Sequence, residues 1–386
     1  MATRTLPATT VPTGVQPTPP RSGWMDNLRV AVIAGVIITH VATAYVLDID
    51  WYYEERTTNA VTQAVVGAII FPAALFAMAT LFLVAGVLSQ RSLARKGPWP
   101  FVRDRLLRLG GPILAYLFVI GPLTSLVGQR AEGALSAEHA GSFLVSEMRR
   151  TDTGPMWFVA ALLSFSVAYG AWRWARPASS SPGGPLRKHH LFAAGAVIVV
   201  GSFAVRLAWP FAAETPLSLN LWEWPQMATM FAFGALATER AWLDPLPDWV
   251  RRACGRAGIA GVAGLLFVVA LVGAAGDQGP FLGGLHAQAV AEPIAEATIA
   301  VAMSLLLLGW FAHRCDNHGP LARSLGRASF AAYVLHPPVV VSLSAAFSSV
   351  GVVAEVKFAV VATLGVLASF TVGWLATRVG SIPRLL

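Results

Sequence analysis

Apolar stretches of about 20 residues recur along almost the whole chain, and they constrain its fold more than any other feature. Each is long enough to cross about 30 Å of hydrocarbon, because an α-helix rises about 1.5 Å per residue. A helix also gives every backbone polar group a partner inside the bilayer. The pattern predicts ten membrane helices, at residues 28–47, 62–88, 110–128, 156–174, 191–211, 224–240, 257–275, 291–312, 329–349 and 356–377.

The small share of charged residues supports a membrane protein. Asp, Glu, Lys and Arg make up 12% of the 386 residues, against about 25% in soluble globular proteins. The bilayer is therefore a predicted partner. Nucleic acid is not, despite a net charge of +8, because basic residues collect in the cytoplasmic loops of membrane proteins. The two cysteines, Cys254 and Cys315, are too few for a disulfide framework.

The distribution of basic residues predicts the orientation of the helices. With the N-terminus inside, 22 of the 28 Lys and Arg residues fall on the cytoplasmic side, as the positive-inside rule requires. A wrong number of helices would invert the later loops and blur this difference. We expect an all-α bundle of about ten transmembrane helices with cytoplasmic N- and C-termini, in the cell (plasma or inner) membrane. The six remaining basic residues lie on the outer side or in the outer half of a helix, and they are Arg56, Arg130, Arg149, Arg150, Arg206 and Lys357.

Two parts of the chain differ in composition. Residues 1–22 are rich in Pro and Thr and lack apolar periodicity, which predicts a disordered cytoplasmic tail. Residues 23–386 are predicted to form a single transmembrane domain. The first apolar stretch is too long for the hydrophobic region of a signal peptide, so we expect a retained helix.

Two ionisable residues of the first predicted helix share one face. Arg29 and His40 are eleven residues apart, which is about three turns and roughly 16 Å along the axis. Arg29 lies at the cytoplasmic end and can hold a polyanion whose flexible arm reaches His40. Coenzyme A has this shape, with phosphates at one end and a thioester at the other. The alternative is a histidine that packs between helices and an arginine that extends to the surface.

A second basic group precedes the third predicted helix, in the inner loop 89–108. Arg105 and Arg108 are one turn apart at the inner mouth of that helix. Guanidinium groups bind phosphate oxygens in a bidentate manner, so this pair is a candidate phosphate site. The alternative is a loop whose charges only set the topology, which suits Arg91, Arg95 and Lys96 better.

The ninth predicted helix contains the segment SFAAYVLHPP, residues 329–338. Tyr333 and His336 stand at i and i+3 on one face. Pro337 and Pro338 remove backbone donors and predict a kink whose freed carbonyls point into a cavity or toward a ligand. A kinked packing helix is the alternative.

Two further carboxylates, Glu292 and Glu296, lie one turn apart in the outer half of the eighth predicted helix. Buried ionisable residues mark functional sites by default. Arg206 lies in the outer half of the fifth helix, however, and pairing with these carboxylates across the bundle is the interpretation we favour.

Several segments together resemble acyltransferase family 3, close to its glucan-modifying branch, which includes proteins similar to glucans biosynthesis protein C. They follow the expected order over nearly all ten helices, and the ordered set is specific although each motif alone is loose. They are DNLRVAVIAGVIITHVATAY (26–45), WYYEE (51–55), LFLVAGVLSQRSL (81–93), RDRLLRLGGP (103–112), PMWFVAALLSF (155–165) with Trp157, FAFGALA (231–237) and LGRASFAAYVLHPPVV (325–340).

The resemblance implies a membrane O-acyltransferase that takes an acyl group, acetyl or succinyl, from cytoplasmic acyl-CoA. The acceptor is a hydroxyl of a carbohydrate or related molecule. In the family, the histidine matching His40 is catalytic, and the arginines matching Arg29, Arg105 and Arg108 are required for activity and here are assigned to acyl-CoA binding. Tyr333, His336, Trp157, Glu292 and Glu296 are further candidates. Ala85 departs from the usual serine of its motif.

The predicted mechanism uses neutral His40 as a general base on the acceptor hydroxyl, or as a transient acyl-imidazole. A thioester is already activated, so acyl-CoA serves as co-substrate and no metal is required. The alternative functions are a secondary transporter or flippase, which predicts paired broken helices in two related halves, and a non-catalytic scaffold. The acceptor, the acyl group and the oligomeric state are left open by the sequence.

Overall fold

The computed structural model describes residues 23–176, 184–243, 245–316 and 319–379, so the predicted disordered tail lies outside the described residues. The described residues form helices and no strands. The helices are α1 (Gly23–Tyr45), α2 (Ala60–Lys96), α3 (Pro98–Ala115), α4 (Gly121–Ala131), α5 (Ala140–Arg150), α6 (Trp157–Ala175), α7 (Lys188–Arg206), α8 (Trp224–Glu239), α9 (Asp248–Ala274), α10 (Gly279–Leu282), α11 (Ala291–Arg314), α12 (Pro320–Phe347) and α13 (Ala354–Ala376).

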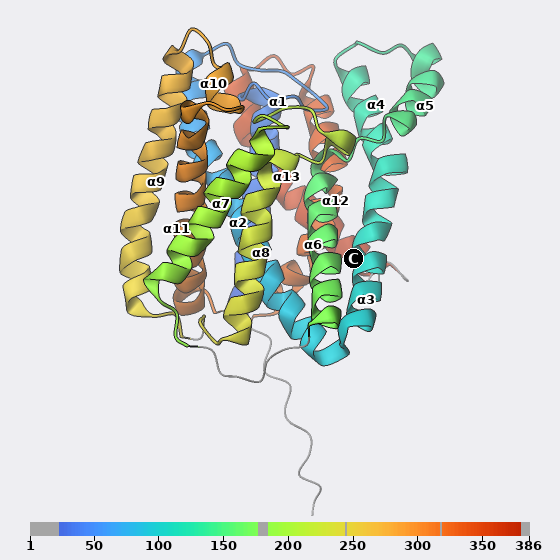
Figure 1. Ribbon diagram of the computed structural model, residues 1–386. Helices are drawn as coiled ribbons and strands as arrows, with labels where there is room; N and C mark the ends of the chain where they lie inside the picture. Colours follow the sequence, from blue (N-terminus) through green and yellow to red (C-terminus); the bar gives the residue numbers. More distant parts are fainter. Residues whose placement is uncertain (1–22, 177–183, 244, 317–318, 380–386) are drawn as a thin grey trace, which may run out of the picture.

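The prediction of an all-α polytopic bundle is confirmed. Among the described residues, nine helical segments are long and apolar enough to cross a membrane. The predicted helix outside these nine is the sixth, at residues 224–240, which corresponds to α8; it has 16 residues and rises only about 24 Å. It is too short to count with the nine, although it runs beside α7 between the same two ends of the bundle (Figure 1).

The two ends of the bundle carry different connections. The turn between α2 and α3 lies at the lower end in Figure 1, together with the last residues of α11 and the first of α9; we call this the basic end. The α4–α5 connection lies at the opposite end, so the loops predicted inside and outside are on different sides. Several helices extend past their predicted apolar limits at the basic end, most of all α2, α3, α9 and α12. Charged side chains reach water there, so helix formation does not stop where the apolar stretch does.

Helix α1 forms the centre of the bundle, where α2, α11, α12 and α13 contact it. Its apolar side chains Leu28, Ile37 and Val41 are fully buried in the main core. A polar residue on this buried face is held among other helices, whereas the face with Ala31, Gly35 and Ile38 is exposed. This position sets the surroundings of His40 and Arg29.

Two glycines bring α2 and α8 into backbone contact. A Cβ on Gly86 would collide with the Phe231 carbonyl, and one on Gly234 would collide with the Leu83 carbonyl. Small residues allow such close packing in membrane helices. The glycines of the motifs at 81–93 and 231–237 therefore act in packing.

A π-helical turn, η1 (Tyr116–Ile120), joins α3 to α4. Such turns are rare and shift the side chains that follow them on the helix surface. The turn buries Tyr116, and this residue contributes to the site described below. The predicted outer loop at 130–155 also contains the helix α5, which the apolar pattern does not indicate.

Candidate active site

His40 lies in the last third of α1 and is half-buried. Its ring Nδ1 is 2.9 Å from the Val36 carbonyl oxygen one turn earlier. A carbonyl only accepts, so Nδ1 carries the proton and donates it. The lone pair of a neutral imidazole is then on Nε2, where it can accept a proton or act as a nucleophile.

His336 on α12 has the same arrangement, and Pro337 explains it. Pro337 has no N–H, so the Tyr333 carbonyl four residues earlier loses its helical partner. The Nδ1 of His336 takes this place at 2.5 Å from the Tyr333 oxygen. The helix continues through both prolines, from Pro320 to Phe347. The predicted freed carbonyl therefore orients a histidine of the same helix.

The two imidazoles lie next to each other, although 296 positions separate them in the sequence. Their ring centroids are 4.8 Å apart, and the Trp51 ring lies 4.5 Å from that of His40. The Nε2 of His336 and the Nε1 of Trp51 are buried and have no hydrogen-bond partner among the described residues. Since buried polar groups are nearly always hydrogen-bonded, these two are the groups best placed to bind a ligand or water.

Aromatic hydroxyls form one side of this site. The Tyr333 hydroxyl donates to the carbonyl oxygen of Pro155, and the Tyr52 and Tyr116 oxygens are 2.9 Å apart. Gly154 has a φ of +43°, and a Cβ there would collide with the Tyr52 hydroxyl. Burial raises the pKa of the Tyr52 phenol, so it remains protonated and able to donate.

The arginines predicted to bind phosphate lie toward the basic end. Arg29 is 3.5 Å from Asp26 of its own helix and lies within electrostatic range of Arg105. Arg105 contacts Ser89 of α2 at 3.4 Å, and its Nε is buried without a partner among the described residues. Three helices thus bring a guanidinium pair together, and an unsatisfied donor of this pair suits a phosphate oxygen.

Arg108 also lies within electrostatic range of Arg105, but its side chain extends to the surface. Its side chain is 51% exposed and contacts Asp104 at 3.0 Å, one turn earlier on α3. Residues three positions apart on a helix are neighbours, but their side chains point in somewhat different directions around the axis. On α3 this difference places the Arg108 side chain at the surface. Arg105 is therefore the less exposed arginine of the predicted pair, and Arg29 is a further basic group within its electrostatic range.

The two groups of residues lie at different depths along α1. Helix α1 is continuous from Gly23 to Tyr45, so Arg29 and His40 remain about 16 Å apart along its axis. One end is basic and the other holds two imidazoles. A molecule with phosphates and a long neutral arm fits this order of groups.

Glu292 and Glu296 lie elsewhere and form an ion-pair cluster with Arg206. The Arg206 guanidinium contacts Glu292 and lies 2.9 Å from Glu296. Arg206 and Glu296 are fully buried between α7 and α11. The predicted pairing across the bundle is confirmed. Their contacts connect helices and do not reach the histidines.

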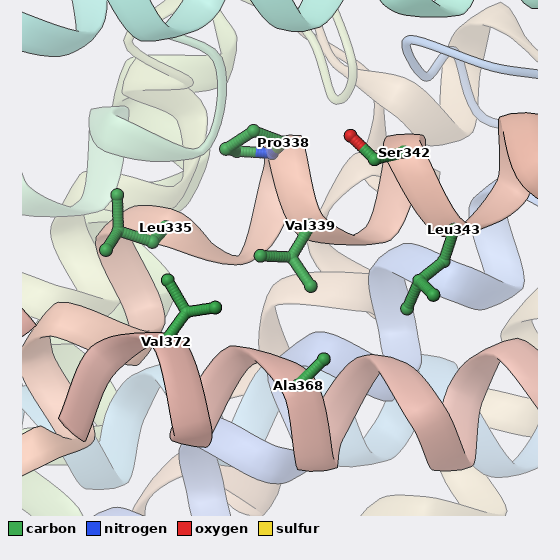
Figure 2. Close-up of a pocket in the computed structure, with 7 residues that line it drawn as sticks. All are labelled: Leu335, Pro338, Val339, Ser342, Leu343, Ala368 and Val372. Atoms are coloured by element: carbon green, nitrogen blue, oxygen red, sulfur yellow. The ribbon is translucent and has the colours of Figure 1, made fainter. Parts of the chain in front are cut away.

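Two other features lie around the site without supplying reactive groups. Trp157 begins α6 and packs against the main core. An apolar groove runs between α12 and α13 on another face of α12, next to Pro338 (Figure 2). The residues that line it are Leu335, Pro338, Val339, Ser342, Leu343, Ala368 and Val372.

Within the ranges that the structure describes, no three His, Cys, Asp or Glu side chains gather where they could hold a metal ion. The groups available for chemistry are the imidazoles, the aromatic hydroxyls and the guanidinium groups described above.

The chain belongs to acyltransferase family 3: residues 22–378 match the family model described as an acyltransferase domain. No curated protein and no solved structure matches the chain. The fold and the family together define a membrane acyltransferase. The glucan-modifying branch suggested by the motifs remains a proposal.

Some parts of the site were not predicted from the sequence. The segment WYYEE was noted, but the contact of Trp51 with His40 depends on how residues 46–59 return over α1. Tyr116 carried no signal, because one tyrosine in an apolar stretch is ordinary, and the π-turn that buries it has no sequence signature.

Proposed function

We propose that this protein transfers an acyl group, acetyl or succinyl, from acyl-CoA to a hydroxyl of a carbohydrate or a related acceptor. One observation carries the proposal: the half-buried His40 has its Nδ1–H held by the Val36 carbonyl, so the Nε2 lone pair is available in the core of an acyltransferase. The basic pair Arg29 and Arg105 lies about three turns away, where it can hold the phosphates of the donor.

In the proposed reaction, the acceptor hydroxyl gives its proton to Nε2 of His40 while its oxygen attacks the thioester carbonyl. The carbon–sulfur bond of the resulting tetrahedral intermediate then breaks. The departing thiolate takes the proton back from Nε2, which restores neutral His40 and releases CoA. In the covalent variant, Nε2 itself attacks the thioester, the carbon–sulfur bond breaks and CoA leaves as the thiolate. The hydroxyl then attacks the acyl-imidazole, the Nε2–acyl bond breaks to restore neutral His40, and the hydroxyl proton passes to the thiolate.

His336 provides a second imidazole at 4.8 Å from His40, and we assign it a role in moving the proton. Its Nδ1 is occupied by the Tyr333 carbonyl, so only Nε2 can exchange a proton. Trp51 packs on His40, and its buried Nε1–H is available for an oxygen of the reacting groups.

The experiment is a transfer assay with purified protein. Radiolabelled acetyl-CoA and succinyl-CoA are incubated separately, with and without carbohydrate acceptors, and CoA release and labelled product are measured. We expect one donor to give acceptor-dependent CoA release that His40→Gln abolishes. Equal CoA release by the parent and His40→Gln with every donor and acceptor would contradict the proposal. Concentrative uptake of a sugar without CoA consumption would favour the alternative, a transporter or flippase.

We further propose that the basic end faces the cytoplasm of a cell-membrane protein, because most Lys and Arg residues gather there. In a background without Cys254 and Cys315, single cysteines at Ala94 and Ala134 test this, since both positions are exposed. A membrane-impermeant thiol reagent added to intact cells should label Ala134→Cys and spare Ala94→Cys. The reverse pattern would overturn the orientation.

A further inference from the structure

A pocket of about 360 Å³ opens between α9 and α11 at the basic end, and neither His40 nor His336 lines it. Its polar side is formed by Arg251, His313 and Arg314, and its apolar side includes Leu306, Leu307 and Trp310. Figure 1 shows α9 and α11 on the opposite side of the bundle from α3, which carries Arg105. The pocket is therefore separate from the basic pair assigned to the acyl donor.

The depth of these side chains follows the structure of a bilayer leaflet. Arg251 lies three residues after the start of α9, and Arg314 is the last residue of α11, so both charges are at the membrane surface. Leu306 lies eight residues before Arg314, about 12 Å deeper. The pocket is cationic at the surface and apolar toward the membrane interior.

Two further observations indicate the charge and the origin of the occupant. Among the described residues that line the pocket there is no carboxylate; Asp248 contacts Arg251 from outside it, at 3.3 Å. The Trp310 ring is half exposed on the outer surface of the bundle. An anionic molecule that enters from the lipid side fits both observations, since tryptophan at this level packs against lipids.

The packing of α9 explains why the space opens only near the surface. At the inner end of the pocket, where Met303 lines it, Gly258 faces Met303 so closely that a Cβ would lie 2.6 Å from its sulfur, and deeper still a Cβ on Gly261 would lie 3.0 Å from Ile299. Toward the basic end the longer side chains of Arg251 and Trp310 border the gap between the two helices.

We propose that this pocket binds an anionic phospholipid of the surrounding leaflet. Arg251 and Arg314 contact the phosphate, which guanidinium groups bind strongly, and an acyl chain lies along Leu306, Leu307 and Trp310. Basic pockets between membrane helices are suited to such headgroups. Bound lipid then connects α9 to α11 at the end where their direct packing is open. This inference does not depend on the proposed acyl transfer.

Native mass spectrometry of the full-length protein in detergent tests the proposal, with phosphatidylglycerol and phosphatidylcholine added separately. We expect one phosphatidylglycerol to bind in preference to phosphatidylcholine. The double variant Arg251→Ala/Arg314→Ala should weaken that binding about 30-fold, since each basic residue near an anionic lipid contributes about 1 kcal/mol. Equal affinity for the two lipids would overturn the proposal.

The matched control is Arg252→Ala/Arg256→Ala, which removes the same charge from exposed positions of α9 outside the pocket. Binding should stay within about threefold of the parent, since only the diffuse surface charge changes. Equal loss in both double variants would mean general attraction to a basic surface and would overturn the site.

Two further measurements test the fold of the double variant and the chemical class of the ligand. Phosphatidylglycerol should raise the melting temperature of the parent and the control but not of Arg251→Ala/Arg314→Ala, whose melting temperature without lipid shows that it folds. Inorganic phosphate or acetyl-CoA should not displace the bound lipid, because neither fills the apolar side. Displacement by either at a concentration comparable to that of the lipid would overturn a phospholipid site.

Discussion

Two clusters of buried ionisable residues differ in how their groups are paired. In the ion-pair cluster, Arg206 binds Glu292 and Glu296 on another helix, so the charges contact each other. In the histidine pair, His40 and His336 each donate to a carbonyl of their own helix. Their Nε2 atoms are left for something that is not part of the bundle.

This comparison separates structural from reactive polar groups. A charged group in a membrane interior must be paired, and a mutual pair connects the helices that carry it. A neutral imidazole can be buried with one hydrogen bond and still keep a lone pair. Glu292, Glu296, His40 and His336 were all candidate site residues because they lie in apolar stretches. Their hydrogen-bond and ion-pair partners now distinguish the structural residues from the reactive ones.

The largest expected effect is on His40. His40→Ala should lower acyl transfer per folded molecule by about 10²–10⁴-fold, which is the usual contribution of a general base. The loss should be larger if an acyl-imidazole forms. Acyl-CoA affinity should change little, because Arg29 and Arg105 are intact. Turnover and CoA binding of purified protein are the measurements, with His40→Gln as the polar control. Turnover within about tenfold of the parent would make His40 structural and His336 the next candidate.

Arg206 should show the opposite behaviour, a large effect on stability and a small one on catalysis. Arg206→Met leaves Glu292 and Glu296 buried without a cation, which costs about 3–5 kcal/mol. Thermal unfolding in detergent measures this loss. The matched control replaces all three residues by Met, and it should recover most of the stability because no buried charge is left unpaired. Loss of turnover in a folded triple variant would contradict a structural role.

The arginines at the basic end should affect acyl-CoA binding. Arg105→Ala should weaken acyl-CoA binding about 10–100-fold, since a charge-assisted hydrogen bond contributes about 1.5–3 kcal/mol. Arg108→Ala should weaken it by about fivefold at most, because this side chain is exposed and already paired with Asp104. Arg105→Lys should recover part of the affinity, since an ammonium lacks the bidentate fork. If the two alanine variants weaken binding equally, Arg108 contributes to acyl-CoA binding as much as Arg105 does.

The smallest effect is expected from Glu223, which precedes α8 near the ion-pair cluster. Burial raises the pKa of its carboxyl to about 7. The positive charge of Arg206 lowers this pKa, and the negative charge of Glu292 raises it further. The folded state therefore keeps a proton that the unfolded state loses above about pH 4.5, and stability falls as pH rises from there to about 7. Glu223→Gln should reduce this fall, by about 1 kcal/mol for a half-buried group. An unchanged pH profile of melting temperature would contradict it.

The length and spacing of the apolar stretches were enough to predict the membrane bundle. They do not determine helix ends, because charged residues at the interface continue a helix as readily as they end it, and α2 extends to Lys96. They did indicate that residues 224–240 form the shortest predicted helix, and α8 has only 16 residues. The helix period alone placed Arg29 and His40 on one face, since both lie on one helix and the distance along it is a local property.

Contacts between helices were decided only by the tertiary structure. The spacing of Arg105 and Arg108 predicted a pair, but the neighbouring helices give the two side chains different surroundings: Arg105 contacts Ser89 of α2, whereas Arg108 is exposed and contacts Asp104. His40 and His336 meet because α12 packs on α1. The sequence by itself determined that each histidine lies within an apolar membrane helix; the structure showed the carbonyl partner of each ring, and packing between distant segments decided that the two rings share one site with Trp51.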